Sequence, residues 1–336
     1  MRETVRTPEN GLQSFGEIGM MDQTKIEWTD FTVNAWEGCQ KVGPGCDHCY
    51  AEARDNRFTG GKHWGPGAPR RKVKSGKPKL RRINRNAPTF FEHYGRWPRV
   101  FCSSLSDVFD NAAPKEWRIE FLNEISLATN TCIQLLTKRV GNVFQMVPPL
   151  WATQWPSHVG LMITVVNQAE ADRDIPKLLE LKARLGIPWV GLSIEPMLAP
   201  IDLTEVRTWR ECNIPEYGGA GHEHLPCLQG SSGGVDWVIC GGESGHNARP
   251  MHPDWARSLR DQCAAAKTSF HFKQWGEWGP CDGPMNGDIE AGILIDNHGQ
   301  LLAGRGPGIT PDIIKKVGKK AAGRLLDGRI HDGMIT

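Results

Sequence analysis

The sequence predicts an α/β protein built as a partial (β/α) TIM-like barrel of six to seven parallel strands with loop insertions. Short apolar runs alternate with helical stretches over about 240 residues, which is typical of parallel strands joined by crossovers. Unusual polar residues follow nearly every apolar run. A doubly wound sheet is the competing architecture, although no GxGxxG motif follows the first predicted strand.

Seven apolar runs are the strand candidates. Each is short and rich in Val, Ile, Leu, Phe or Trp, as expected of strands buried on both faces. They are Thr32–Trp36, Arg99–Ser103, Cys132–Leu136, Val159–Val165, Trp189–Ile194, Asp236–Cys240 and Ser269–Phe272.

Helices are expected between these strands. Pro and an acid open the first and third of them, and Gly186 ends the second as a C′ glycine. A basic helix is expected near the C-terminus. The four predicted helices are Pro114–Thr129, Ala169–Leu185, Pro253–Lys267 and Thr310–Leu326.

Composition places the chain among globular proteins. Of its 336 residues, 39% are apolar and 23% are charged, which excludes a largely disordered chain. We expect a flexible leader at residues 1–22 and one barrel domain at 23–336, with insertions at about 57–98 and 207–234. No apolar run is long enough to cross a membrane, and no signal peptide is evident, so a cytoplasmic protein is expected.

The first insertion is strongly basic. Between Arg57 and Phe101 there are thirteen Lys and Arg residues and one acid, Glu92. A field of this sign suits a nucleic-acid backbone, while a solvated, mobile loop is the alternative. The residues predicted to contact nucleic acid are Arg70, Arg71, Lys72, Arg81, Arg82 and Arg85. Trp64 and Trp97 flank this run and could stack on a base.

Three cysteines follow the first predicted strand as Cys39-x6-Cys46-x2-Cys49. Ten cysteines in a chain without an export signal favour thiol, metal or redox chemistry over disulfides. Three thiolates can hold a [4Fe–4S] cluster and leave one iron open, which is the basis of radical S-adenosylmethionine chemistry. Zinc with a fourth ligand such as His48, or three unligated thiols, are the alternatives.

Strand ends carry the remaining candidate residues. In a barrel, chemistry gathers at the carboxyl ends of the strands. There we expect substrate contact or proton handling by Lys138, Arg139, Lys273 and Glu277. Phosphate contact is an alternative role for Lys138 and Arg139.

The second insertion contains Cys212, His222, His224 and Cys227. These residue types could hold zinc, but their spacing fits no standard finger, so an ordinary polar loop is the alternative.

Several motifs resemble a family of phage-type three-cysteine-motif proteins, a domain family of unknown function. The resemblance covers about residues 24–334 and implies a phage or prophage origin, with a place in the host cytoplasm. The matching runs begin at Lys25 (KIEWTD), Ser104 (SLSDVF), Leu136 (LTKR), Ser193 (SIEP), Gly241 (GGESG) and Phe272 (FKQWGEW).

A second resemblance is to the radical S-adenosylmethionine superfamily, which includes DNA-repair lyases such as spore photoproduct lyase. Its usual first cysteine gap is x3 and an aromatic residue precedes the last cysteine, whereas here the gap is x6 and His48 takes that position. The resemblance implies a [4Fe–4S] cluster, S-adenosylmethionine, and an electron donor such as flavodoxin or ferredoxin. The residues it implies for the cofactor are Ser104, Ser106, Asn167, Glu195, Gly241 and Gly242.

The sequence therefore favours a radical S-adenosylmethionine-type enzyme that acts on nucleic acid, with DNA preferred, as a repair lyase or a base-modifying enzyme. One alternative is a zinc-stabilised nucleic-acid-binding protein without catalysis. Another is a metal-dependent hydrolase or nuclease on the same barrel, using Asp107, Glu195 and Glu243.

Overall fold

The computed structural model describes residues 23–214, 219–228, 233–280, 292–296, 301–302 and 312–335. The expected leader at 1–22 lies outside these residues. Side chains of 207–226 are also outside the described part, so the zinc hypothesis for Cys212, His222 and His224 is untested.

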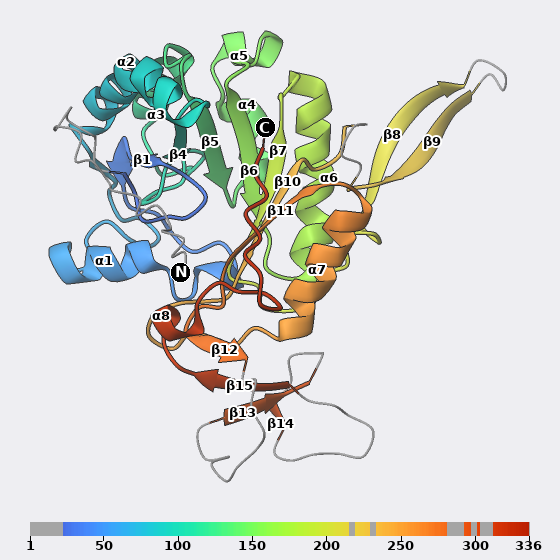
Figure 1. Cartoon of the computed structure of the whole chain (residues 1–336). Helices are drawn as coiled ribbons and strands as arrows, with labels where there is room; N and C mark the ends of the chain where they lie inside the picture. Colours follow the sequence, from blue (N-terminus) through green and yellow to red (C-terminus); the bar gives the residue numbers. More distant parts are fainter. Residues whose placement is uncertain are drawn as a thin grey trace, which may run out of the picture.

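Seven parallel strands form one curled sheet, which confirms the predicted partial barrel (Figure 1). Each strand pairs with the next one of the sheet along the chain, and the two edges do not meet. In spatial order the strands are β1 (Phe31–Val33), β4 (Arg99–Cys102), β5 (Cys132–Thr137), β6 (Val159–Thr164), β7 (Val190–Ile194), β10 (Trp237–Gly241) and β11 (Ser269–Gln274).

Helices cover the outer face of the sheet (Figure 1). Their apolar side chains pack against alternate strand residues in one large core. The helices, with two short 3-10 turns, are η1 (Pro44–Cys46), α1 (Tyr50–Thr59), α2 (Gly76–Tyr94), α3 (Lys115–Ser126), η2 (Val140–Asn142), α4 (Val143–Met146), α5 (Pro149–Thr153), α6 (Gln168–Leu185), α7 (Pro253–Ala265) and α8 (Lys319–Ala322). None of the described helices is long and apolar enough to span a bilayer.

The inner face of the sheet has its own aromatic core. Trp28, Phe101, Trp189 and Trp237 gather there with Met162. Since successive strand residues point to opposite faces, neighbours such as Val238 enter the outer core instead. This aromatic layer leaves the carboxyl ends of the strands free for polar residues.

Helix α2 corrects the expectation that the basic insertion is a loop. It runs for 19 residues, and Leu80, Ile83 and Ala87 are buried on one face. Spacings of three and four residues place these side chains on one helical stripe. Before α2, the short strand β3 (Arg71–Lys72) pairs antiparallel with β2 (Trp36–Glu37).

The second insertion is also more regular than expected. Its backbone forms an antiparallel hairpin of β8 (Arg207–Ile214) and β9 (Gly219–Pro226). The unpatterned Gly- and His-containing sequence gave no strand signal.

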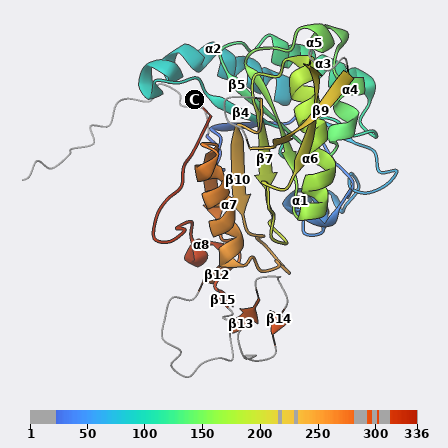
Figure 2. The same ribbon diagram turned by 90° about the vertical axis from the view of Figure 1, so that its right-hand side faces the viewer.

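The predicted helix Thr310–Leu326 is wrong. Its first part is the strand β15 (Asp312–Lys316), which pairs with β12 (Trp278–Pro280) and β13 (Gly292–Ile295). Strand β14 (Leu301–Leu302) completes this small sheet, which lies beyond the lower end of the main sheet in both views (Figures 1 and 2). Gly318, with φ of 84°, separates β15 from α8 and ends any continuous helix.

The C-terminal segment runs beside the edge strand β11. His271 and Asp332 form an antiparallel bridge, and the Trp237 indole donates to the Gly333 carbonyl at 2.8 Å. These contacts cover an edge that would otherwise be open to pairing.

Candidate functional site

A cavity of about 450 Å³ opens at the carboxyl ends of the strands. Its walls come from the residues after β4, β5, β7 and β10, the last residues of β6 and β11, and the three-cysteine loop. Parallel strands bring these sequence-distant segments to one edge of the sheet, where sites of α/β proteins form. Cys39, Cys46 and Cys49 all line the cavity.

Five buried polar atoms of this wall have no hydrogen-bond partner among the described residues. They are Trp28 Nε1, Ser103 Oγ, Ser106 Oγ, Thr164 Oγ1 and Gln274 Oε1. Buried polar groups without a partner are costly, so they mark places where a ligand or water completes the bonding. The wall is therefore suited to a polar ligand.

The three-cysteine loop packs closely against its surroundings. Gly38 has φ of 106°, and a Cβ there would lie 2.4 Å from the His63 carbonyl oxygen. A Cβ on Gly45 would lie 2.6 Å from Val166 Cγ1, beyond the end of β6. Larger residues would push the loop away from the strand ends, so these glycines set the position of the cysteines.

The three sulfurs are not gathered around one point. Among the described residues, no three His, Cys, Asp or Glu side chains stand close enough to share a metal ion. The Cys39 thiol lies against Arg139 at 3.5 Å and the Gln40 carbonyl at 3.6 Å. Burial raises the pKa of Cys39 to about 11, as expected of a protonated thiol. Three cysteines on one cavity wall supply the donor type that an iron–sulfur cluster takes.

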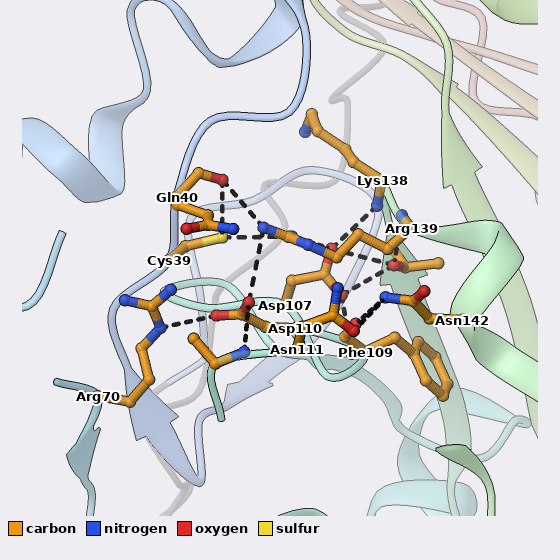
Figure 3. A network of polar contacts seen from close by, with 12 residues as sticks. Cys39, Gln40, Arg70, Asp107, Phe109, Asp110, Asn111, Lys138, Arg139 and Asn142 are labelled. Atoms are coloured by element: carbon orange, nitrogen blue, oxygen red, sulfur yellow. Dashed lines mark hydrogen bonds and ion pairs between the residues drawn. The ribbon is translucent and has the colours of Figure 1, made fainter. Parts of the chain in front are cut away.

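A buried polar network stands behind Cys39 (Figure 3). Arg139 forms an ion pair with Asp107 at 2.9 Å and donates to the Gln40 carbonyl at 3.0 Å. Asp107 also accepts from the Thr137 hydroxyl and the Lys138 amide. The network fixes the first cysteine relative to the ends of β4 and β5.

A second network ties the other end of the cysteine loop to the segment after β10. Glu243 accepts from His48 Nδ1 at 2.9 Å and from Arg249 Nη2 at 2.6 Å. Arg249 also reaches Asp47 and the Pro44 carbonyl. Burial opposes the charge of Glu243, but these hydrogen bonds hold its pKa below the usual range. We call Glu243, Arg249, Asp47 and His48 the loop latch.

Most predicted strand-end residues reach the cavity. Those that line it are Ser104, Ser106, Lys138, Arg139, Glu195, Gly242 and Lys273. Lys273 and Glu195 form an ion pair at 3.0 Å. Ser104 Oγ accepts from Asn34 at 2.9 Å, so this hydroxyl already has a partner.

Three predicted residues lie outside the lining. Asn167 caps α6 by accepting from the Glu170 amide at 2.9 Å. Glu277 accepts from the Gly245 amide at 2.9 Å. Gly241 precedes Gly242, and a Cβ on it would lie 2.7 Å from Glu195 Oε1. All three shape loops around the site.

The basic run is largely paired with acids. Arg70 is fully buried and forms an ion pair with Asp110 at 2.7 Å, so it is not available to a phosphate. Arg71 pairs with Glu37, Lys72 with Glu120, and Arg81 with Glu124. Arg82 and Arg85 are exposed and have no ion pair with a described residue.

Four other cysteines are buried away from the cavity. Cys102, Cys240 and Cys263 are buried in the core, and Cys227 donates to the Leu203 carbonyl at 3.0 Å.

Sequence reasoning missed the cavity residues Lys25 and Lys319, which come from outside the predicted strand ends.

The family described as "Protein of unknown function (DUF5131)" matches residues 23–335. The chain belongs to this family. The predicted resemblance to a family of unknown function is thereby confirmed, and the phage origin stays a prediction. No curated protein matches the DUF5131 chain.

Two solved structures are similar to this DUF5131 chain. One is a mutant of spore photoproduct lyase with dinucleoside spore photoproduct, at 12% identity and a TM-score of 0.38. The other is spore photoproduct lyase complexed with the same compound, at 11% identity and a TM-score of 0.35. Each match covers 88% of this chain and 71% of the other. At these values the likeness carries no argument about function.

Proposed function

We propose that this protein is a radical S-adenosylmethionine-type enzyme that acts on nucleic acid, with DNA preferred. The observation that carries the proposal is that three cysteines and five residues with an unpartnered polar atom line one cavity at the strand ends. Thiols are the ligands that iron–sulfur clusters require, and three of them leave one iron open.

Cys39, Cys46 and Cys49 would hold the cluster. When bound, it would supply the electron that cleaves a carbon–sulfur bond of S-adenosylmethionine. The unpartnered oxygens of Ser106, Thr164 and Gln274 are suited to the polar groups of that cofactor. In this proposal Arg139 orients Cys39 through their contact, and the loop latch positions Cys46 and Cys49.

Lys273 and Glu195 are the best candidates for handling a proton. Both line the cavity, and their ion pair places a donor and an acceptor at the ends of β11 and β7, the two strands on either side of β10. General acid–base chemistry needs such groups within hydrogen-bond reach of the reacting atoms. An electron donor such as flavodoxin or ferredoxin would reduce the cluster.

The pairing of the carboxylates argues against the hydrolase alternative. Asp107 is bound to Arg139, Glu195 to Lys273 and Glu243 to Arg249. To bind the metal ion of a nuclease, these carboxylates would have to be free of ion pairs and close together. Each is instead neutralised by its own cation.

Reductive cleavage of the cofactor tests the proposal. The protein is reconstituted anaerobically with iron and sulfide, reduced with dithionite and given S-adenosylmethionine. We expect 5′-deoxyadenosine and methionine, measured by chromatography, and their loss in Cys39→Ser, Cys46→Ser and Cys49→Ser. Cys132→Ser is the matched control, because Cys132 is only partly buried in β5 and lies outside the cavity lining. No 5′-deoxyadenosine from an iron-loaded wild type would overturn the proposal.

A further inference from the structure

The charged residues of the cavity do not balance. Its lining includes six Lys and Arg residues against four acids. Three of the acids, Asp107, Glu195 and Glu243, already hold an Arg or Lys. The fourth, Glu27, is exposed, and Lys41 lies 3.8 Å from Glu52.

Three lysines remain without an acid. Lys25, Lys138 and Lys319 form no ion pair with any residue that the structure describes. They come from the segment before β1, the end of β5 and the start of α8, so they reach the cavity from three directions. Unpaired cations around a concave, low-dielectric wall focus a positive potential and attract anions.

Trp64 adds an aromatic surface to the same cavity. It lines the cavity half-buried, and the next residue, Gly65, donates to the Cys39 carbonyl at 2.8 Å. The indole is thus held beside the three-cysteine loop. Aromatic rings beside cationic groups are the usual platform for a single-stranded nucleic acid, whose bases stack and whose phosphates need cations.

We infer that Lys25, Lys138 and Lys319 bind the phosphates of a single nucleic-acid strand, and that Trp64 stacks on one of its bases at the cavity. The inference rests on the proposed function only for the statement that this strand is the substrate. It places strand binding at the cavity and not on helix α2. Figure 1 shows α2 near the end of the sheet opposite to β12–β15, whereas α8 lies beside that small sheet.

Fluorescence anisotropy with a labelled single-stranded oligonucleotide of about twelve nucleotides tests the inference. In the Lys25→Ala, Lys138→Ala, Lys319→Ala variant we expect at least about tenfold weaker binding. The slope of log affinity against log salt should fall by about 2, since each lost phosphate contact contributes about 0.7. The matching triple Lys→Arg variant should keep the affinity, which separates loss of charge from loss of fold.

Trp64→Leu should weaken binding about fivefold to a hundredfold, because the indole can no longer stack on a base. Trp97→Leu is its control, since Trp97 is 40% exposed and stacks on Phe91 away from the cavity lining. Arg82→Ala with Arg85→Ala is the control for charge. Unchanged binding in the cavity variants, or a loss confined to the Arg82 and Arg85 variant, would overturn the inference.

Two further measurements identify the ligand: competition by a free nucleotide, and a comparison of strand binding with cofactor cleavage. Thymidine monophosphate that competes as well as the oligonucleotide would show a free-nucleotide site and overturn strand binding. The binding assay uses metal-free protein, so the measured affinity for the oligonucleotide does not depend on what the cysteines bind. Strand binding without cofactor cleavage would overturn the proposed function alone, and cleavage without strand binding would overturn this inference alone.

Discussion

Helix α2 and the rim of the cavity both carry clustered Lys and Arg residues, but different groups face them. On α2 and the strand before it, Lys72 and Lys77 share Glu120, and Arg81 forms two hydrogen bonds to Glu124. At the cavity, three lysines have no acid partner among the described residues. The sequence segment with the densest positive charge is thus largely paired with acids in the fold.

The difference shows what paired charges do in each region. The pairs of Lys72, Lys77 and Arg81 hold the insertion against Glu120 and Glu124 of α3. The pairs at the cavity join separate loops, as the loop latch does, and leave selected cations for a ligand.

The largest effect is expected where a basic-run charge is fully buried. Arg70→Ala leaves the buried Asp110 carboxylate with Arg139, 3.7 Å away, as its remaining cation and should lower the free energy of unfolding by about 3 kcal/mol. Urea denaturation measures this. Arg82→Ala, an exposed change in the same run, should stay within about 0.5 kcal/mol. Equal effects of the two variants would contradict a structural role for Arg70.

A smaller, local effect is expected at the loop latch. Arg249→Ala removes a charged hydrogen bond to the buried Glu243, contributing about 1.5–3 kcal/mol, and one to the exposed Asp47, contributing less than about 1 kcal/mol. Amide hydrogen exchange should therefore become faster at residues 43–49, with little change in the strands. Arg54→Ala serves as the control. It also breaks an Arg–Glu pair, but that pair joins α1 to Glu37 and does not involve residues 43–49. Uniform exchange across the chain in Arg249→Ala would contradict the latch.

The smallest effect concerns a single carboxyl on α3. Hydrogen bonds from Lys72 and Lys77 lower the pKa of Glu120 to about 2 from an ordinary 4.5. The folded pKa is the lower one, so this pairing stabilises the fold above about pH 4.5 and is lost as the pH falls through about 2. In Lys72→Ala with Lys77→Ala, the Glu120 carboxyl should titrate near its ordinary pKa, as followed by NMR. A titration unchanged by the two substitutions would show that the basic run is not neutralised there.

Sequence patterns predicted the main sheet well because its strands are buried on both faces. All seven predicted strands exist, and Arg99–Ser103 differs from β4 by one residue. The predicted polar strand ends also converge, since parallel topology brings carboxyl ends to one edge. These features depend on local apolar runs and on one topological rule.

Other features depend on contacts that local patterns do not contain. Lysines and arginines, with Pro88 inside, obscured the buried stripe of α2. The residues that neutralise Lys77 and Arg81 lie 43 positions away along the chain. Strand β15 forms because β12 and β13 pair with it, although its sequence continued a helical pattern. The sequence also does not show which cavity lysines lack an acid partner among the described residues, because the other cavity charges are paired across loops that are distant in the sequence.

Metal and sulfide analysis of anaerobically reconstituted protein, with its visible spectrum, tests most directly whether Cys39, Cys46 and Cys49 hold a cluster. We predict about four iron and four sulfide ions per chain and an absorption band at about 410 nm. The band and the iron should be lost in Cys49→Ser and kept in Cys132→Ser. A colourless protein that retains a single zinc ion and no iron would contradict the account.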